Sequence, residues 1–229
     1  MTTAVAKRPS RRLFLRLKRD QSGVAMIEFA YSLPILMLLG FTGVEVAYLT
    51  IANMRVSQIA MTVADNLSRA KQAVPLGLPQ LREVDINDGL IGAQIQGGST
   101  LNILENGRII VSSLQTNSAG RQTIAWQRCK GNLRVTSAYG NEGTTQPTGG
   151  FQGMGSGSNR VQAEPNTAII FAEVVYDYEP LFGEWVLGTI RLRREAAFYV
   201  RDDRDLTAVY DPNPKAKVKS TCNLYNADF

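Results

Sequence analysis

The chain has 229 residues and a formal net charge of +5 at pH 7, but this charge is concentrated at one end. Residues 1–23 contain seven Lys or Arg and one acidic residue, whereas the other 206 residues contain 18 basic and 19 acidic side chains. A nearly neutral body argues against a nucleic-acid partner, and the absence of histidine excludes Ser-His-Asp and Cys-His catalysis and imidazole metal ligands.

The basic leader, residues 1–23, is followed by an apolar segment. Residues 24–44 carry a single charged side chain, Glu28. As a helix they span about 30 Å, the thickness of one hydrocarbon core, and basic residues ahead of a span keep that end in the cytoplasm. The sequence therefore predicts a single-pass membrane protein whose C-terminal part lies across the membrane. The alternative is a cleaved secretory signal, which usually has a shorter apolar region and a small-residue cleavage site.

The helix is expected to continue beyond the membrane as an amphipathic segment. Apolar residues recur there at a spacing near 3.6, which is typical of a helix with one buried face. These residues are Ala52, Val56, Ile59, Val63 and Leu67. Pro75 predicts an end at Val74, so we expect one transmembrane and amphipathic helix over residues 24–74. Pro34 lacks the N–H that bonds to the preceding turn, so a kink is expected there, either with a role in assembly or simply tolerated.

Residues 75–229 are predicted to form an α+β domain with an antiparallel sheet. A weak helix is expected over residues 80–96, and Asn106-Gly107 between two apolar runs predicts a hairpin. Residues 168–178 and 190–200 alternate with a period of two, which predicts two strands. One face of this sheet would pack on the apolar stripe of the long helix.

The sequence also allows predictions for two further segments of this domain. Residues 140–160 contain seven glycines and few large apolar side chains, which predicts a mobile Gly-rich loop. Arg191, Arg193 and Arg201 share one face of a predicted strand with Glu195, and we expect that face to be solvated.

The chain contains two cysteines, Cys129 and Cys222, both beyond the predicted span. In an oxidising compartment they are expected to form a disulfide, and the alternative is two unpaired thiols. Such a bridge closes a long loop, which on the chain-entropy model stabilises the fold by up to about 4–5 kcal/mol.

Glu28 is the leading candidate for a functional side chain. A carboxylate inside hydrocarbon is costly, so such residues usually have a function. If a peptidase cuts after Gly23, Val24 gains a free α-amino group that Glu28 of a neighbouring chain can pair with, and the penalty for leaving either charge unpaired would fix the register between helices. The alternative is a tolerated acid near the interface. Glu45, near the other end of the span, is expected to be a solvated interfacial acid.

The residues around Glu28 resemble a known family. The segment from Gly23 to Phe29 resembles the Gly-x-x-x-x-Glu-Tyr processing motif of Flp-type pilins and pseudopilins, with Phe29 in place of the usual tyrosine. The string from Glu28 to Leu36, EFAYSLPIL, resembles the EFA-x-x-x-P opening of TadE-like proteins of the tight-adherence (Tad) pilus system. The later segment 175–181, VYDYEPL, resembles their C-terminal strand motif.

This resemblance implies a location, partners and a function. It implies a protein of the bacterial inner membrane with a cytoplasmic N-terminus and a periplasmic domain, cut after Gly23 by a prepilin peptidase. The product would be a non-catalytic minor pilin or pseudopilin that works with other pilins and Tad assembly-platform proteins, with Glu28, Phe29 and Pro34 in the assembly helix. Whether it enters the extracellular pilus is left open. The expected fold is pilin-like, a long helix packed on an antiparallel sheet.

Two other functions are weighed against this one. The first is an uncleaved membrane anchor whose periplasmic domain is a scaffold for another envelope protein. The second is a membrane-anchored enzyme. A pair of Asp or Glu side chains is able to supply the catalytic groups of such an enzyme, but no cluster of metal ligands in the sequence supports this function. No cofactor, metal or small-molecule substrate is implied.

Overall fold

The computed structural model describes residues 22–147, 150–183, 188–201, 203–212, 216 and 218–229. The chain divides into two compact units, Met1–Ala47 and Tyr48–Phe229. Most of the predicted leader, residues 1–21, lies outside the described residues. The described part of the first unit is helical and belongs to helix α2 (Ser22–Arg69), which continues into the second unit.

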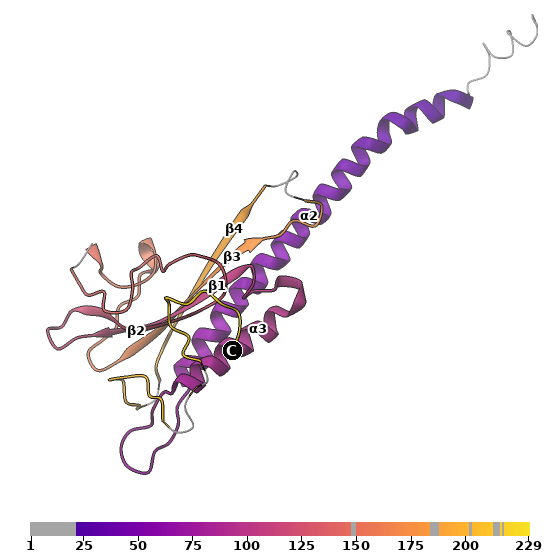
Figure 1. Cartoon of the computed structure of the whole chain (residues 1–229). Coiled ribbons are helices and arrows are strands. Elements are labelled where there is room, and N and C mark those ends of the chain that lie inside the picture. The colour runs from indigo at the N-terminus through magenta and orange to yellow at the C-terminus, as the bar shows by residue number, and fades with distance from the viewer. Residues whose placement is uncertain (1–21, 148–149, 184–187, 202, 213–215, 217) are drawn as a thin grey trace, which may run out of the picture. The chain divides into compact units, whose positions relative to one another are not determined.

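The second unit has the predicted α+β fold (Figure 1). After α2 the elements are α3 (Glu83–Leu101), β1 (Gly107–Thr116), β2 (Gln122–Lys130), the short 3-10 helix η2 (Gly157–Asn159), β3 (Ala168–Tyr178) and β4 (Ile190–Tyr199). The strands form one antiparallel sheet in the order β2-β1-β3-β4. β1 therefore pairs with its neighbour in sequence on one side and with the later strand β3 on the other.

The main core lies between the helices and one face of the sheet. The predicted apolar stripe of α2 is buried, with each member at most 2 % exposed: Ala52, Val56, Ile59, Val63 and Leu67. It shares one core cluster with α3 and with alternate residues of β3, among them Ile170, Ala172 and Val174. The apolar stripe of α2 therefore packs on the apolar face of β3, and the two patterns predicted from the sequence form one core.

Helix α2 ends at Arg69, five residues before the predicted end at Val74. Gln72 and Gln80 exchange backbone hydrogen bonds of 2.8 and 2.9 Å, which closes the residues between them into a loop. The pairing occupies the N–H and C=O groups of Gln72, which a longer helix would need for its own hydrogen bonds. Pro75 therefore lies inside the loop and does not itself set the end of the helix.

A side chain distant in the sequence satisfies the last turn of α2. Arg204 Nη1 donates to the carbonyl oxygens of Leu67 at 2.9 Å and Ala70 at 2.7 Å. The last carbonyls of a helix have no partner within it, so a buried helix end needs donors from elsewhere. The Arg204 side chain supplies one of them.

The predicted hairpin at Asn106-Gly107 is wrong. Helix α3 extends to Leu101, and Asn102 ends it in a left-handed conformation with φ of 44°. The two residues that follow are buried in a turn and form no strand. Gly107 begins β1, where a Cβ atom would lie 2.7 Å or less from the carbonyl oxygens of Ile103 and Val175, so close backbone approach explains this glycine.

The second face of the sheet is also buried. A separate core cluster forms there from β1, β2, β3 and the segment after β2, and it includes Ile124, Ile169 and Phe171. The Gly-rich segment 140–160 contributes its two large apolar side chains, Phe151 and Met154, to this cluster. The described part of the segment is therefore packed against the sheet through these two side chains, whereas its composition predicted a mobile loop.

Candidate assembly site on the N-terminal helix

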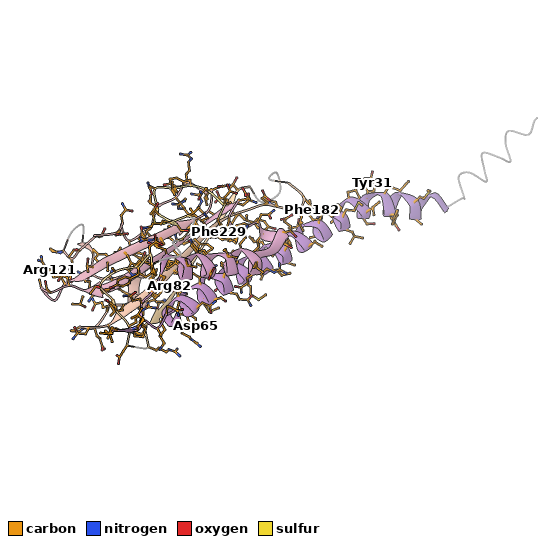
Figure 2. All side chains as sticks on the ribbon, turned by 60° about the horizontal axis from the view of Figure 1, so that its bottom comes forward. Tyr31, Asp65, Arg82, Arg121, Phe182 and Phe229 are labelled. Atoms are coloured by element: carbon orange, nitrogen blue, oxygen red, sulfur yellow. A yellow bond between two sulfur atoms is a disulfide. The ribbon has the colours of Figure 1, made fainter. Side chains whose placement is uncertain are left out.

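The first part of α2 is apolar and exposed. Every residue from 23 to 41 is exposed, and Figure 2 shows side chains such as Tyr31 projecting from this part of the helix. A helix that is apolar on all sides is stable in lipid or among other apolar helices. Among the described residues, α2 is the one helix long and apolar enough to cross a membrane.

Glu28 is the charged side chain of this exposed segment. It lies one helical turn after Val24 and one turn before Ser32, so the three share one face of α2. The carboxylate therefore lies on the same helix face as the residue that follows the predicted cleavage point. In a bilayer this face requires a cationic partner or a proton, because an unpaired carboxylate in hydrocarbon is costly.

Pro34 lies within an uninterrupted stretch of α2. Its ring nitrogen removes one donor from the helix. In the turn before it, the Ser32 hydroxyl donates a hydrogen bond of 3.2 Å to the carbonyl of Phe29, whose ring is exposed. This bond reaches the carbonyl of Phe29 and not that of Ala30, which Pro34 deprives of its helical donor. The kink and the assembly roles of Phe29 and Pro34 remain predictions.

Gly23 has no packing reason to be glycine. An added Cβ atom would meet nothing within 4 Å. It also lies within α2, where glycine costs about 1 kcal/mol relative to alanine. Gly40 and Gly43 of the same helix are equally free of close contacts, so the role of Gly23 in processing stays a prediction.

Glu45 differs from its prediction. Its side chain is fully buried, whereas a solvated acid was expected at this end of the span. A buried carboxylate has to be hydrogen-bonded, paired or protonated. Glu45 is therefore a structural residue of α2 and not part of an exposed face.

Cys129 and Cys222 form a disulfide that joins β2 to the C-terminal segment. Two buried cations hold the same segment. Arg108 donates to the carbonyls of Gly131, Cys222 and Leu224 at 2.7 to 3.0 Å, and its guanidinium lies 4.0 Å from the ring centre of Tyr225. Burial lowers the pKa of Arg108. The C-terminal segment is therefore fixed by a covalent bond and by charge-assisted hydrogen bonds.

Lys130, the last residue of β2, is the second buried cation. Its ammonium group donates to Asn226 Oδ1 at 3.2 Å and to the carbonyl of Asp228, and it lies 4.4 Å from the ring centre of Phe229. Burial lowers the pKa of Lys130, and the nearby Asp228 partly offsets this effect. Sequence reasoning missed both cations, and a local signal exists only for Arg108, a basic residue directly before an apolar run.

Glu173 is a fully buried carboxylate on β3. It accepts hydrogen bonds from the Ser137 hydroxyl and the Ala138 N–H, and Arg193 Nη2 lies 3.5 Å away. Burial raises the pKa of Glu173 more than these donors lower it. Of the strand face that was expected to be solvated, Arg191 and Arg201 are exposed, whereas Arg193 and Glu195 are half-buried in contacts with Glu173 and Tyr139.

Two features of the described residues bear on the enzyme alternative. Ser68 and Lys71 form a Ser-x-x-Lys string, but Ser68 is buried and its hydroxyl donates to the Asp65 carbonyl at 2.7 Å. No group of three or more His, Cys, Asp or Glu side chains able to hold a metal ion occurs in the part of the chain that the structure describes.

The comparison with protein families bears on the helix. Residues 23–65 match the model of the family described as TadE-like protein. This segment is TadE-like. The match includes Gly23, Glu28, Phe29 and Pro34, so the resemblance noted from the sequence is confirmed over these residues. No curated protein and no solved structure matches the chain.

The TadE-like segment and the exposed apolar helix together indicate a membrane-anchored protein involved in Tad pilus assembly. The match ends at residue 65 and so covers the helix but not the sheet. What the second unit does has to be argued from its own structure.

Proposed function

We propose that this protein is a non-catalytic minor pilin or pseudopilin that supports the biogenesis of a Tad-type pilus. The observation that carries the proposal is the exposed apolar helix with one acid, Glu28, five residues after a glycine that packing does not explain. A TadE-like match over the same residues supports it.

The proposed mechanism has three steps. The basic leader orients the chain, and α2 inserts with its N-terminus in the cytoplasm. A prepilin peptidase then cuts after Gly23, which leaves a cationic amine on Val24. Finally, the helix packs laterally against other pilin helices, and Glu28 pairs with the amine of a neighbour. A buried ion pair adds little net stability, but a mismatched register leaves two uncompensated charges, so the pair selects one alignment.

The domain formed by residues 48–229 is proposed to lie in the periplasm. Its disulfide, Cys129–Cys222, fits an oxidising compartment. There the domain would make lateral contacts with other proteins of the assembly system. Phe29 and Pro34 are proposed to shape the packing surface of the helix.

Replacement of Glu28 tests this function. Glu28→Ala is expected to leave membrane insertion and protein level unchanged but to reduce the number of pili per cell, counted by electron microscopy. Glu164→Ala is the matched control, because Glu164 is an exposed acid far from α2 in the sequence. Normal piliation with Glu28→Ala at normal protein level would contradict the proposed role of the carboxylate.

A further inference from the structure

The chain seals one edge of its sheet. Strand β2 forms this edge, and each of its outward-facing N–H groups between Gln122 and Gly131 has an acceptor. The C-terminal segment and the loop after β2 supply them: Ser220 O for Cys129, Asn226 O for Gly131, Thr144 O for Ile124, Glu142 Oε2 for Gln127 and Gln146 Oε1 for Gln122. With its donors occupied, this edge is closed to a further strand.

The opposite edge, β4, is open (Figure 1). The Val200 N–H donates to the Ala168 carbonyl at 2.9 Å, so the even-numbered residues of β4 bond to β3 and the odd-numbered residues direct their N–H and C=O groups outward. The outward residues are Arg191, Arg193, Glu195, Ala197 and Tyr199. Within the part of the chain that the structure describes, none of their N–H groups has an acceptor.

The open edge is rich in arginine. Residues 190–201 contain four arginines and one glutamate. Two of these arginines bind carboxylates of β3, whereas Arg194 and Arg201 have no carboxylate partner among the described residues. The Arg194 guanidinium donates to the outward carbonyl of Arg193 at 2.8 Å, so its charge lies at the edge itself.

A small pocket opens beside the same strand. It has a volume of about 170 Å³ and is lined by Glu195 and Ala197 of β4, by Phe171 of β3 and by the segment around η2, including Val161. A strand added to a sheet places alternate side chains on each face, so such a pocket lies where an added strand would project one of them.

We propose that β4 binds an extended, acidic segment of a partner polypeptide as a fifth strand of the sheet. The outward N–H groups would supply the main-chain hydrogen bonds, Arg194 and Arg201 would attract acidic side chains, and the pocket would receive one side chain. A second copy of this chain fits less well, because it would bring the same excess of arginines to the edge. The proposal does not depend on how the helix functions.

Hydrogen exchange provides the first test. In the full-length protein purified in detergent, the amides of Arg193, Glu195 and Ala197 are expected to exchange fast, and those of the intervening even-numbered residues slowly. In native membranes the odd-numbered amides are expected to slow by roughly tenfold or more, because the added strand closes them. Equal exchange of the odd-numbered amides in both preparations would overturn the proposal and would mean that the arginines only deter pairing.

Substitution at the edge provides the second test. Ala197→Pro removes an outward N–H without removing a bond to β3, and Ala197→Val is its matched control. With a photo-crosslinker at the exposed Tyr199 of the full-length protein in native membranes, the proline variant is expected to lose most of the cross-linked product and the valine variant to keep it. Arg194→Glu is expected to lose it too, and Arg121→Glu, at a distant turn, to keep it.

The cross-linked peptide identifies the occupant, and its sequence is read by mass spectrometry. An acidic segment of a different protein, lost with Ala197→Pro and Arg194→Glu, supports the proposal. A β4 peptide from a second copy, or a product that all four variants retain, overturns it. If Ala197→Pro does not fold, the Arg194→Glu and Arg121→Glu pair and the exchange pattern decide the outcome.

Discussion

Glu173 is a carboxylate buried within the sheet, and its surroundings make part of the stability of the domain depend on pH. Burial raises its pKa above the ordinary value, although Ser137, Ala138 and Arg193 act in the opposite direction. Because the folded-state pKa is above the unfolded-state one, the folded protein holds this proton more tightly. The resulting stabilisation is fully present below the unfolded pKa, near 4.3, and is lost as the pH rises through the folded pKa.

Glu173→Gln should therefore change the pH dependence of stability. Glutamine stays neutral, so the free energy of unfolding of the variant, relative to that of the native chain, is expected to rise as the pH increases from about 4 toward neutral. Denaturant titrations at a series of pH values measure this difference. Glu164→Gln, at an exposed position, is the control. A difference that is constant with pH, or that falls, would show that Glu173 is not destabilised by its charge.

Single residues of the candidate site differ in how far the sequence reveals them. Gly23 and Glu28 were found because their spacing and apolar context are local features of the chain. Arg108, Lys130 and Glu173 were missed because their partners are distant, as in the contact between Lys130 and Asn226, 96 residues apart. A charged residue beside an apolar run predicts that its side chain is paired with another polar group. The identity of that partner follows only from the fold.

At the scale of elements, long-range contacts decided where helices end. The apolar stripe of α2 and the alternation of β3 and β4 follow from local periodicity and were predicted. The end of α2 at Arg69 and the extension of α3 to Leu101 were not, because they depend on the pairing of Gln72 with Gln80 and on the burial of the residues after α3. Terminal boundaries are where tertiary contacts override propensity most easily.

The contacts of Arg204 lead to a prediction about how the end of α2 contributes to stability. Arg204→Ala removes the donor to the carbonyls of Leu67 and Ala70 at a buried helix end and is expected to lower the free energy of unfolding by about 1–3 kcal/mol. Chemical denaturation of the purified protein measures the loss. Arg201→Ala is the control, since Arg201 is exposed, and we expect a change within about 0.5 kcal/mol. Equal stability of the two variants would contradict the capping role.

A second prediction at this scale concerns how much the disulfide contributes to stability. Replacing Cys129 and Cys222 together by serine is expected to lower the free energy of unfolding by about 2–5 kcal/mol, because the bridge spans 93 residues. The C-terminal segment should also become a site of limited proteolysis, since only non-covalent contacts, among them those of Arg108 and Lys130 and the backbone hydrogen bonds to β2, then hold it. Proteolysis at the same rate as in the bridged protein would show that the non-covalent contacts suffice.

At the scale of the whole molecule, the two units differ in how far the sequence alone predicted them. The first is a TadE-like apolar helix with one acid, which the sequence alone identified. The second is a sheet domain whose α+β class, late strands and disulfide were predicted, whereas the burial of its second face and the difference between its two edges were not. We interpret the helix as the part that joins the pilus assembly and the sheet as the part that selects a partner.

The most direct test of the central claim is the N-terminus of the mature chain, since a processed pilin and a permanent anchor differ there. Intact mass and N-terminal sequencing of the protein from its native membrane are expected to give a chain that begins at Val24. Substitution of Gly23 by a bulky residue should leave the leader attached. A native chain that retains residues 1–23 would contradict the proposed processing and would favour the scaffold alternative.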